Sequence, residues 1–475
     1  MAIIYNEEKQ VFGLQTPHAT YMMGLADGKY LGHIHFGKKI ESLDGAYLLR
    51  TEEPPYVPSK NKREKCSFLD SFPMEYSFGG VGDYRESCVE VRNARGYRGC
   101  EFVYKSHEIK AGKPKLSGLP ATFGTPDACE TLEITMADEV LKLEMLLSYS
   151  IFADSDVVAR SVRFKNKGEE PVYLEKAYSA CLDMDDREFE MLSLHGSWAR
   201  ERQMERRALG HGRQMVSSIR GESSHQEHPF LALLTPGTTQ ESGEVYGMHF
   251  VYSGNFLAQA ELTQFDTVRM TMGIHPCNFE WKLNPGEEFT APEVILVYSD
   301  KGLGGMTRTL HDLYRNHLIR SPYLHKKRPV LINNWEATYF NFDTDKLLAI
   351  AREAKKCGIE MLVMDDGWFG KRNADNCSLG DWQVNSDKLP GGLADLVEKV
   401  KDIGLSFGIW FEPEMISPDS NLYRAHPDYA IQIPGREASE SRQQYVLDLS
   451  RQEIVDYVYE MVAEVLRSAD ISYVK

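Results

Sequence analysis

Short apolar runs in the last third of the chain end abruptly in polar and aromatic residues. One such run opens LINNWEATYF at residues 331–340, and another opens MLVMDDGWFG at residues 361–370. A short apolar run with polar boundaries is typical of a strand buried on both faces. The polar residues that follow each run therefore lie just past the carboxyl end of a predicted strand.

The segment between these two runs has the periodicity of a helix. Apolar side chains gather on one broad face of residues 343–360, and Gly358 is the expected stop signal. The same order then repeats as a helix near 393–404 with a strand near 405–415, and as a helix near 451–469 with a strand at 471–475. Alternating helices and strands predict a parallel sheet, and active sites in such folds lie at the carboxyl edge of the sheet.

The chain up to about residue 325 alternates with the period of β-strands instead. TLEITM at residues 131–136 is a clear example, and turn residues separate many further runs of this kind. Two alternating stretches flank Asn166, Lys167 and Gly168, which predicts a hairpin across this turn. Many strands without parallel connections favour a large antiparallel β-sandwich.

These patterns predict a multidomain protein of β plus α/β class. Residues 1–325 are expected to form an N-terminal β-sandwich domain that ends in a linker helix near 302–321. Residues 326–475 hold the four predicted strand and helix repeats. With 475 residues, of which 42% are hydrophobic, the chain is long enough to bury two or more cores.

Charge and cysteine usage narrow the class of protein further. Acidic side chains outnumber basic ones by 70 to 54, whereas a nucleic-acid-binding surface is basic. No run of 18 apolar residues occurs, and the N-terminus lacks the charged start and hydrophobic block of a signal peptide. The eight cysteines form neither CxxC pairs nor zinc spacings, which is typical of reduced, mostly buried thiols. We therefore expect a soluble, acidic, cytoplasmic protein that binds neither nucleic acid nor membrane.

The candidate chemistry lies in carboxylates and tryptophans near the predicted strand ends, since the chain has no GxSxG elbow and no HExxH motif. The residues concerned are Trp335, Asp365, Asp366, Trp368, Trp410, Glu412 and Glu414. Aromatic rings beside acceptor-rich carboxylates, with few cations, suit a neutral polyhydroxylated ring. Two adjacent carboxylates can bind neighbouring hydroxyls where side-chain alternation relaxes at a strand end. Two alternatives stay open, namely DDGW as a helix cap or turn, and the four carboxylates as an oxygen-ligand metal site.

Long segments of the chain resemble the bacterial α-galactosidases of glycoside hydrolase family 36. In the α/β part, the resemblance is carried by NNWEATYFNF, LVMDDGWFG, SLGDWQVNSDKLPGGL, FGIWFEPEMISPDSNLYRAHPDY and VLDLSR. In the β-rich part, it is carried by segments such as YLGHIHFGKKI, MEYSFGGVGDYR, GSWARER and GEVYGMHFVYSGNFLA. The resemblance covers essentially the whole chain. It implies a large N-terminal antiparallel β-sandwich followed by the first half of a (β/α)8 (TIM) barrel.

The resemblance implies retaining, exo-acting hydrolysis of terminal α-galactosyl residues in melibiose, raffinose and related α-galactosides. The family uses one aspartate as nucleophile and a second as acid and base, so no cofactor and no metal is expected. The family nucleophile lies two residues after the lysine of a YVKWD motif, and Tyr473, Val474 and Lys475 match its first three residues. Both catalytic aspartates are then expected after Lys475. We therefore assign no catalytic residue within the chain and expect it to be inactive alone.

The resemblance also implies a set of substrate-binding residues. Asp365 and Asp366 match the pair that binds galactose hydroxyls and selects the axial 4-hydroxyl. The remaining matches are Trp335 and Trp410 as pocket walls, Arg442 as an arginine near the pocket, Lys475 as the lysine beside the nucleophile, and Trp198 of GSWARER as a sandwich residue that reaches toward the sugar. The alternative for Arg442 is a structural ion pair, and for Trp198 it is a place in the core.

The resemblance further implies assembly into a homo-oligomer. In tetrameric relatives, a loop from a neighbouring subunit supplies an aspartate and an arginine to the pocket. The corresponding region of this chain offers Glu52 or Glu53, and Lys65 with Arg63 nearby, so both the assignment and the contribution stay open. We expect a small-molecule α-galactoside as substrate and a homotetramer as in full-length relatives. Two alternatives are a non-catalytic carbohydrate-binding fragment and a galactosyltransferase relative that makes raffinose-type sugars.

Overall fold

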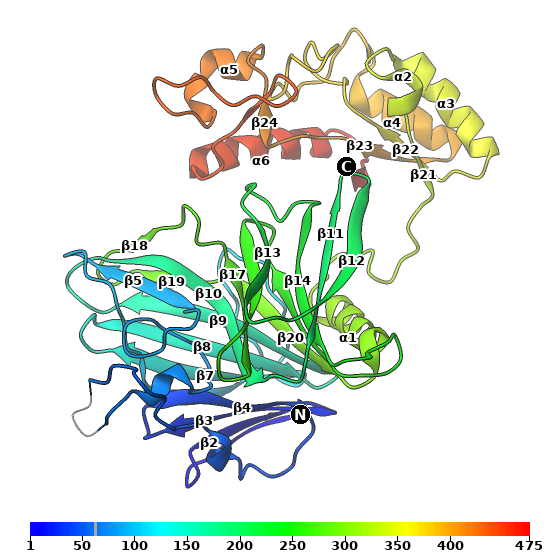
Figure 1. The fold of residues 1–475 in the computed structure, drawn as a ribbon. Helices are drawn as coiled ribbons and strands as arrows, with labels where there is room; N and C mark the ends of the chain where they lie inside the picture. Colours follow the sequence, from blue (N-terminus) through cyan, green and yellow to red (C-terminus); the bar gives the residue numbers. More distant parts are fainter. Residues whose placement is uncertain (61–63) are drawn as a thin grey trace. The chain divides into compact units, whose positions relative to one another are not determined.

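The structure is a computed structural model, and it describes residues 1–60 and 64–475. The chain divides into two compact units, Met1–Leu324 and His325–Lys475. Unit 1 consists mainly of antiparallel strands, whereas unit 2 alternates parallel strands with helices (Figure 1). Among the described residues, no helix combines the length and the apolar character that crossing a membrane requires.

Unit 1 is built from three antiparallel sheets. The first is an N-terminal meander of β1 (Ala2–Asn6), β2 (Val11–Gln15), β3 (Ala19–Ala26) and β4 (Tyr30–Lys38). The second has ten strands, namely β6 (Val103–Ala111), β7 (Cys129–Asp138), β8 (Leu143–Phe152), β9 (Ser155–Asn166), β11 (Glu190–Ser197), β12 (Arg200–Ala208), β14 (Glu227–Leu234), β15 (Val245–Val251), β19 (Glu288–Thr290) and β20 (Glu293–Ser299). The third has six, namely β5 (Val89–Asn93), β10 (Val172–Asp185), β13 (Gly212–Ser218), β16 (Phe256–Leu262), β17 (Thr267–Ile274) and β18 (Trp281–Leu283).

The main core of unit 1 lies between these sheets. In β7, Leu132, Ile134 and Met136 are buried, and they alternate with partly exposed polar residues. They join one continuous cluster of apolar residues from all three sheets. The period-2 pattern therefore marked the buried faces correctly, and the predicted β-sandwich is confirmed.

The hairpin predicted across Asn166 and Gly168 was wrong. Strand β9 belongs to the ten-stranded sheet, whereas β10 pairs with β5, β17 and β18 in the six-stranded sheet. The Asn166 side chain donates to the backbone carbonyls of Glu170 and Leu283 at 2.9 and 3.0 Å, so it holds the chain where it crosses between sheets. A turn signal marks a change of direction, and it does not identify the strand that will pair.

One long helix, α1 (Gly302–His317), covers part of the ten-stranded sheet. Leu303, Met306, Leu310 and Leu313 pack against buried residues of β9, β14, β15 and β20. The helix ends at His317, four residues before the predicted end near 321. It is an integral part of unit 1, because its apolar face packs on that unit's sheet.

Unit 2 is organised around a four-stranded parallel sheet. The order is β21 (Leu331–Asn333), β22 (Met361–Met364), β23 (Ser406–Ile409) and β26 (Tyr473–Val474), with neighbours in register. The helices α3 (Thr344–Lys356), α4 (Gly392–Ile403) and α6 (Gln452–Arg467) follow β21, β22 and β23. Shorter elements are α2 (Trp335–Thr338), β24 (Met415–Ile416), α5 (Asn421–Ala425) and β25 (Tyr445–Val446). Consecutive parallel strands joined through helices are the arrangement predicted for the first half of a (β/α)8 barrel.

Helix α3 illustrates how the sequence sets these elements. The Asp343 side chain caps its start by accepting a hydrogen bond from the Lys346 backbone N–H at 2.9 Å. Leu347 and Ala351 lie one turn apart and are fully buried against the sheet. Gly358 ends the segment with a φ of 81°, a left-handed conformation that favours glycine.

Candidate active site

The carboxyl ends of the four parallel strands place one polar or aromatic side chain each at the same edge of the sheet. Asn333 is the last residue of β21, and Asp365 follows β22 directly. Trp410 follows β23, and Lys475 follows β26. Residues that are 142 positions apart in the sequence therefore meet at one edge, because the strands run parallel and in register.

Asp365 is a buried carboxylate that accepts hydrogen bonds from three donors. The Lys475 ammonium donates to its Oδ2 at 2.5 Å, and the Asn333 amide donates to the same oxygen. The Asp366 backbone N–H donates to Oδ1 at 2.9 Å. The Asp365 N–H in turn donates to the Asn334 side chain at 2.8 Å. These contacts balance the charge of the carboxylate and determine its orientation.

Asp366 is bound by a cation that sequence reasoning missed. The fully buried Arg372 donates from Nη2 to Oδ2 at 2.8 Å and from Nε to both carboxylate oxygens at 2.9 and 3.2 Å. Its Nη1 donates to the backbone carbonyls of Asp375 and Cys377 at 2.5 and 2.8 Å. The expectation of few cations near the carboxylates was therefore wrong, because Arg372 and Lys475 pair with one aspartate each. The only local signal was the pair of basic residues that follows DDGWFG.

Charge and lone-pair geometry restrict what this pair of aspartates can bind. Each carboxylate has about four acceptor positions, and each already accepts about three hydrogen bonds from protein groups. About one acceptor position per aspartate is left for a ligand. Because both negative charges are paired, the site suits two neighbouring hydroxyls of a neutral molecule.

Lys388 connects the loops that carry these groups through hydrogen bonds to their backbone. Its Nζ donates to the carbonyls of Gly367, Phe340 and Arg372 at 2.7, 2.9 and 3.0 Å. Burial lowers the pKa of Lys388 to about 8. Sequence reasoning missed this residue too, because its partners are backbone carbonyls with no side-chain signal.

The three tryptophans predicted near the strand ends differ in burial. Trp368 is fully buried, and its indole N–H donates to the Trp410 carbonyl at 2.9 Å. Trp335 and Trp410 are only partly buried, and the Trp335 and Phe340 rings form a T-shaped pair with 5.0 Å between their centroids. Trp368 is therefore a core residue, whereas Trp335 and Trp410 remain available as walls of a pocket.

Arg442 forms an ion pair at the margin of the site. Its guanidinium lies 2.7 Å from Asp375 and 3.7 Å from Glu412. Asp375 also lies 3.8 Å from Arg372, so Arg442 connects to Asp366 through two intermediates. The structural ion pair left open for Arg442 is present, and its role near the pocket stays a prediction.

Glu412 follows a strand that ends earlier than predicted, because β23 stops at Ile409. Burial, which outweighs the attraction of Arg442, raises the pKa of Glu412. Its Oε2 is enclosed and has no hydrogen-bond partner among the residues that the structure describes. Ionisation of this carboxyl therefore opposes folding.

The structure also bears on the two alternatives left open above, namely a helix cap or turn at DDGW and a metal site formed by the four carboxylates. Gly367 has a φ of 104°, so the segment does turn, but the carboxylates before it face Lys475 and Arg372 and cap no helix. Glu414 is exposed, and within the described ranges no group of three or more His, Cys, Asp or Glu side chains is placed to hold a metal ion. The four carboxylates considered as metal ligands thus do not form one cluster.

Two of the regions that were predicted to contribute to sugar binding, those of Trp198 and Glu53, belong to unit 1. Trp198 lies at the tip of the β11–β12 hairpin with 81% of its surface exposed, so the core alternative was wrong. The Glu53 carboxylate accepts from the backbone N–H groups of Lys65 and Cys66 at 3.1 and 3.2 Å, which engages it within its own loop. Arg63 lies outside the described residues. The sugar-binding roles of all these residues stay predictions.

Comparison with known proteins agrees with this architecture. The model of the glycosyl hydrolase family 36 N-terminal domain matches residues 29–284, and the melibiase model matches residues 288–475. Alpha-galactosidase AgaA of Geobacillus stearothermophilus is 46% identical over the whole chain. The chain belongs to glycoside hydrolase family 36.

Other family 36 members are similar to the chain over its full length. The bifunctional alpha-galactosidase/sucrose kinase AgaSK of Mediterraneibacter gnavus is 47% identical over 100% of the chain. The crystal structure of AgaB from Geobacillus stearothermophilus superposes with a TM-score of 0.97 at 46% identity, over 100% of this chain and 65% of that one. A variant of AgaA in complex with raffinose superposes over 98% of this chain and 65% of that one with a TM-score of 0.96. The chain spans 65% of the length of AgaA and 51% of the length of AgaSK.

Proposed function

We propose that this family 36 chain forms the sugar-binding half of a retaining, exo-acting α-galactosidase for melibiose, raffinose and related α-galactosides. The observation that carries the proposal is the pair of adjacent, buried and charge-balanced aspartates, Asp365 and Asp366. Each keeps about one acceptor position, which matches two neighbouring hydroxyls of a neutral sugar. The named relatives are α-galactosidases, and one of them has been crystallised with raffinose.

In this proposal, the residues at the carboxyl edge of the sheet have distinct roles. Asp365 and Asp366 bind the galactose hydroxyls, and a charged acceptor for the axial 4-hydroxyl discriminates against glucose. The walls of the pocket and its margin would be formed by Trp335, Trp410 and Arg442, whereas a sugar-binding role for Trp198 of unit 1 rests on the family resemblance alone. Lys475 holds Asp365 and would also lie beside the nucleophile of the family motif.

We do not propose any described carboxylate as the nucleophile. Asp365 and Asp366 each accept hydrogen bonds from a cation, and Asp365 also accepts from Asn333 and from the Asp366 backbone N–H, which lowers their nucleophilicity and suits binding. By resemblance, both catalytic aspartates follow Lys475. We therefore propose that residues 1–475 alone bind galactose without hydrolysing α-galactosides.

The main experiment uses a chain extended past Lys475 with the corresponding segment of a family 36 relative. Asp366→Asn should lower kcat/KM on p-nitrophenyl α-galactoside by at least about 100-fold, because a buried charged acceptor for a hydroxyl is lost. Asp428→Asn is the matched control, since Asp428 pairs with Arg451 at 3.2 Å but is exposed. An Asp366→Asn variant within threefold of the parent would remove this aspartate from the proposed pocket.

The second experiment uses the 475-residue chain itself. We expect no turnover of p-nitrophenyl α-galactoside, together with binding of galactose that is tighter than binding of glucose in a titration. Robust turnover by homogeneous protein of verified intact mass would contradict the proposal. Asp365 and Asp366 would then be the first candidates for the nucleophile.

The proposal also covers the cellular location and the oligomeric state of the protein. All eight cysteines are free, which suits a reducing compartment such as the cytoplasm. By analogy with tetrameric relatives, we propose a homo-oligomer. Light scattering of the extended chain tests the oligomeric state directly.

A further inference from the structure

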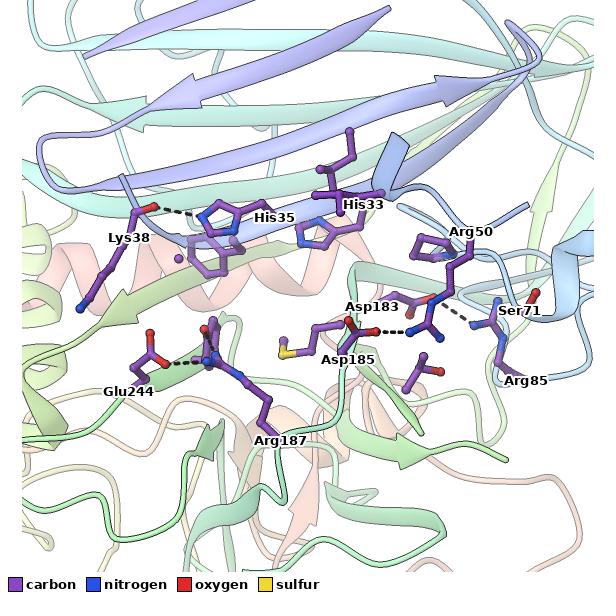
Figure 2. Close-up of a pocket in the computed structure, with 18 residues that line it drawn as sticks. His33, His35, Lys38, Arg50, Ser71, Arg85, Asp183, Asp185, Arg187 and Glu244 are labelled. Atoms are coloured by element: carbon purple, nitrogen blue, oxygen red, sulfur yellow. Dashed lines mark hydrogen bonds and ion pairs between the residues drawn. The ribbon is translucent and has the colours of Figure 1, made fainter. Parts of the chain in front are cut away.

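Unit 1 contains a cavity of about 380 Å³ that the proposed function does not use. Its walls come from β4, from the end of β10 and the loop after it, and from the start of β15 (Figure 2). Small-molecule sites in proteins have volumes of about 300–1,000 Å³, so the cavity is large enough for a ligand. None of its lining residues belongs to the candidate active site.

The floor of the cavity is a closed ion-pair network. The buried Arg85 donates to Asp83 at 2.9 Å and to the carbonyls of Leu69 and Phe72 at 3.0 and 2.6 Å. The buried Asp183 accepts two hydrogen bonds of 2.7 Å from a further buried arginine, Arg269. These charges are satisfied within the protein, so the floor provides shape and is not available to a ligand.

The rim of the cavity carries ion pairs of a different kind. Arg50 contacts Asp185 through a single nitrogen at 2.8 Å, and both side chains are solvent-exposed. Arg187 donates to Glu244 at 2.6 Å and to the Tyr246 hydroxyl, and it is also exposed in part. Exposed pairs of this kind contribute about 0–1 kcal/mol, so an incoming anion can take the place of Asp185.

Basic side chains are more frequent in the cavity lining than in the acidic protein as a whole. The lining includes four cationic side chains, Lys38, Arg50, Arg85 and Arg187, against three carboxylates, Asp183, Asp185 and Glu244, and Lys38 also lies 3.6 Å from the carboxylate of Asp300. The chain as a whole has a net charge of −16. Guanidinium groups bind carboxylates and phosphates through two parallel hydrogen bonds, so they favour an oxyanion at this rim.

The other walls argue against a neutral sugar as the ligand. The aromatic rings at the cavity, Phe36 and Tyr246, are buried, so neither offers an exposed face on which a sugar ring could stack. His33 and His35 line the wall formed by β4, as Figure 2 shows. Burial lowers the pKa of His35, so it offers hydrogen bonds and no positive charge at neutral pH. Recognition therefore depends on the rim arginines.

We propose that this cavity binds a small organic anion whose carboxylate or phosphate group is held by Arg50 and Arg187. The volume accommodates a molecule up to about the size of a hexose phosphate. The inference is independent of the proposed α-galactoside site, because the cavity lining includes none of the residues proposed for that site.

Calorimetric titration of the 475-residue chain tests the proposal with four probes: inorganic phosphate, citrate, glucose 6-phosphate and neutral galactose. We expect saturable binding of citrate or glucose 6-phosphate that weakens as salt is added. The preferred probe identifies the group as carboxylate or phosphate. The double variant Arg50→Gln with Arg187→Gln should weaken that binding about tenfold or more, because hydrogen bonds to a charged group are lost. Arg163→Gln is the matched control, since Arg163 is an exposed arginine that faces Glu288 outside the cavity.

Asp185→Asn separates the proposal from binding of a neutral ligand. Removing the competing negative charge should tighten binding of the anion by about threefold, whereas a neutral polyol would exchange a charged acceptor for a weaker neutral one and bind more weakly. Asp366→Asn should leave anion binding unchanged, so failure of the α-galactoside proposal would not affect this test. The inference is overturned if no anion binds saturably, or if the double arginine variant, folded by circular dichroism, binds as the parent does.

Discussion

Two aspartate–arginine pairs of equal length show how differently the same contact acts in the two units. In unit 2, the Arg372 Nη2 lies 2.8 Å from Asp366 Oδ2, and the side chains are 0% and 3% exposed. In unit 1, the Arg50 Nη2 lies 2.8 Å from Asp185 Oδ1, and the side chains are 38% and 73% exposed. The distance is the same, but water screens one pair and is excluded from the other.

The surroundings of the two pairs explain what each one can do. Arg372 donates hydrogen bonds to Asp366 and to two backbone carbonyls. The arginine therefore connects the aspartate to the main chain. Arg50 uses one nitrogen on one carboxylate oxygen. A pair of the first kind positions a side chain for binding, whereas a pair of the second kind can exchange partners with a ligand.

The largest effect is expected from breaking the buried pair. Arg372→Met should lower the free energy of unfolding of unit 2 by about 3–5 kcal/mol, because it leaves the Asp366 carboxylate buried without a cation. Urea unfolding followed by tryptophan fluorescence measures this, since Trp335, Trp368, Trp382 and Trp410 all lie in unit 2. Arg424→Met is the control, because Arg424 pairs with Asp419 at 2.7 Å on an exposed surface. A loss below 1 kcal/mol would mean that burial does not distinguish the two pairs.

An intermediate effect is expected at Glu412, a largely buried carboxyl whose contact with Arg442 is a long one of 3.7 Å and whose Oε2 accepts no hydrogen bond from the described residues. Its pKa in the folded protein lies above the ordinary value of 4.5, so the folded state binds the proton more tightly than the unfolded state. The contribution of protonated Glu412 to the free energy of unfolding is therefore lost as the pH rises through this raised pKa. Glu412→Gln should be more stable than the parent at pH 7, by less than the loss in Arg372→Met, and this advantage should shrink toward pH 4. Equal differences at both pH values in urea unfolding would refute the assigned direction.

The smallest effect is expected from breaking the exposed pair. Arg50→Gln should change the free energy of unfolding by no more than about 1 kcal/mol, because water already solvates both partners. Any difference from the parent should fall further in 1 M salt, where charges are screened over about 3 Å. Thermal unfolding at low and high salt measures both points. A loss above 2 kcal/mol would show that this rim pair supports the fold and cannot exchange with a ligand.

Much of unit 2 could be predicted because its signals are local. Asp343, Leu347, Ala351 and Gly358 mark the start, buried face and end of α3 within sixteen residues. Asp365 and Asp366 were recognisable because they follow an apolar run, and parallel strands bring such positions to one edge. The cation on Asp366 was not recognisable, because an arginine six residues away resembles any solvated surface arginine until the loop folds back.

The sequence alone determined which faces are buried and where strands and helices begin, because these depend on side-chain periodicity within one element. It also determined the family, because the segments that carry the resemblance are long. Only the tertiary structure decided which strands pair, so β9 and β10 belong to different sheets despite the turn between them. It also decided that Arg372 and Asp366 share a dry environment whereas Arg50 and Asp185 share water. Pairing and solvent exclusion depend on residues far apart in the chain, and periodicity within a segment carries no information about them.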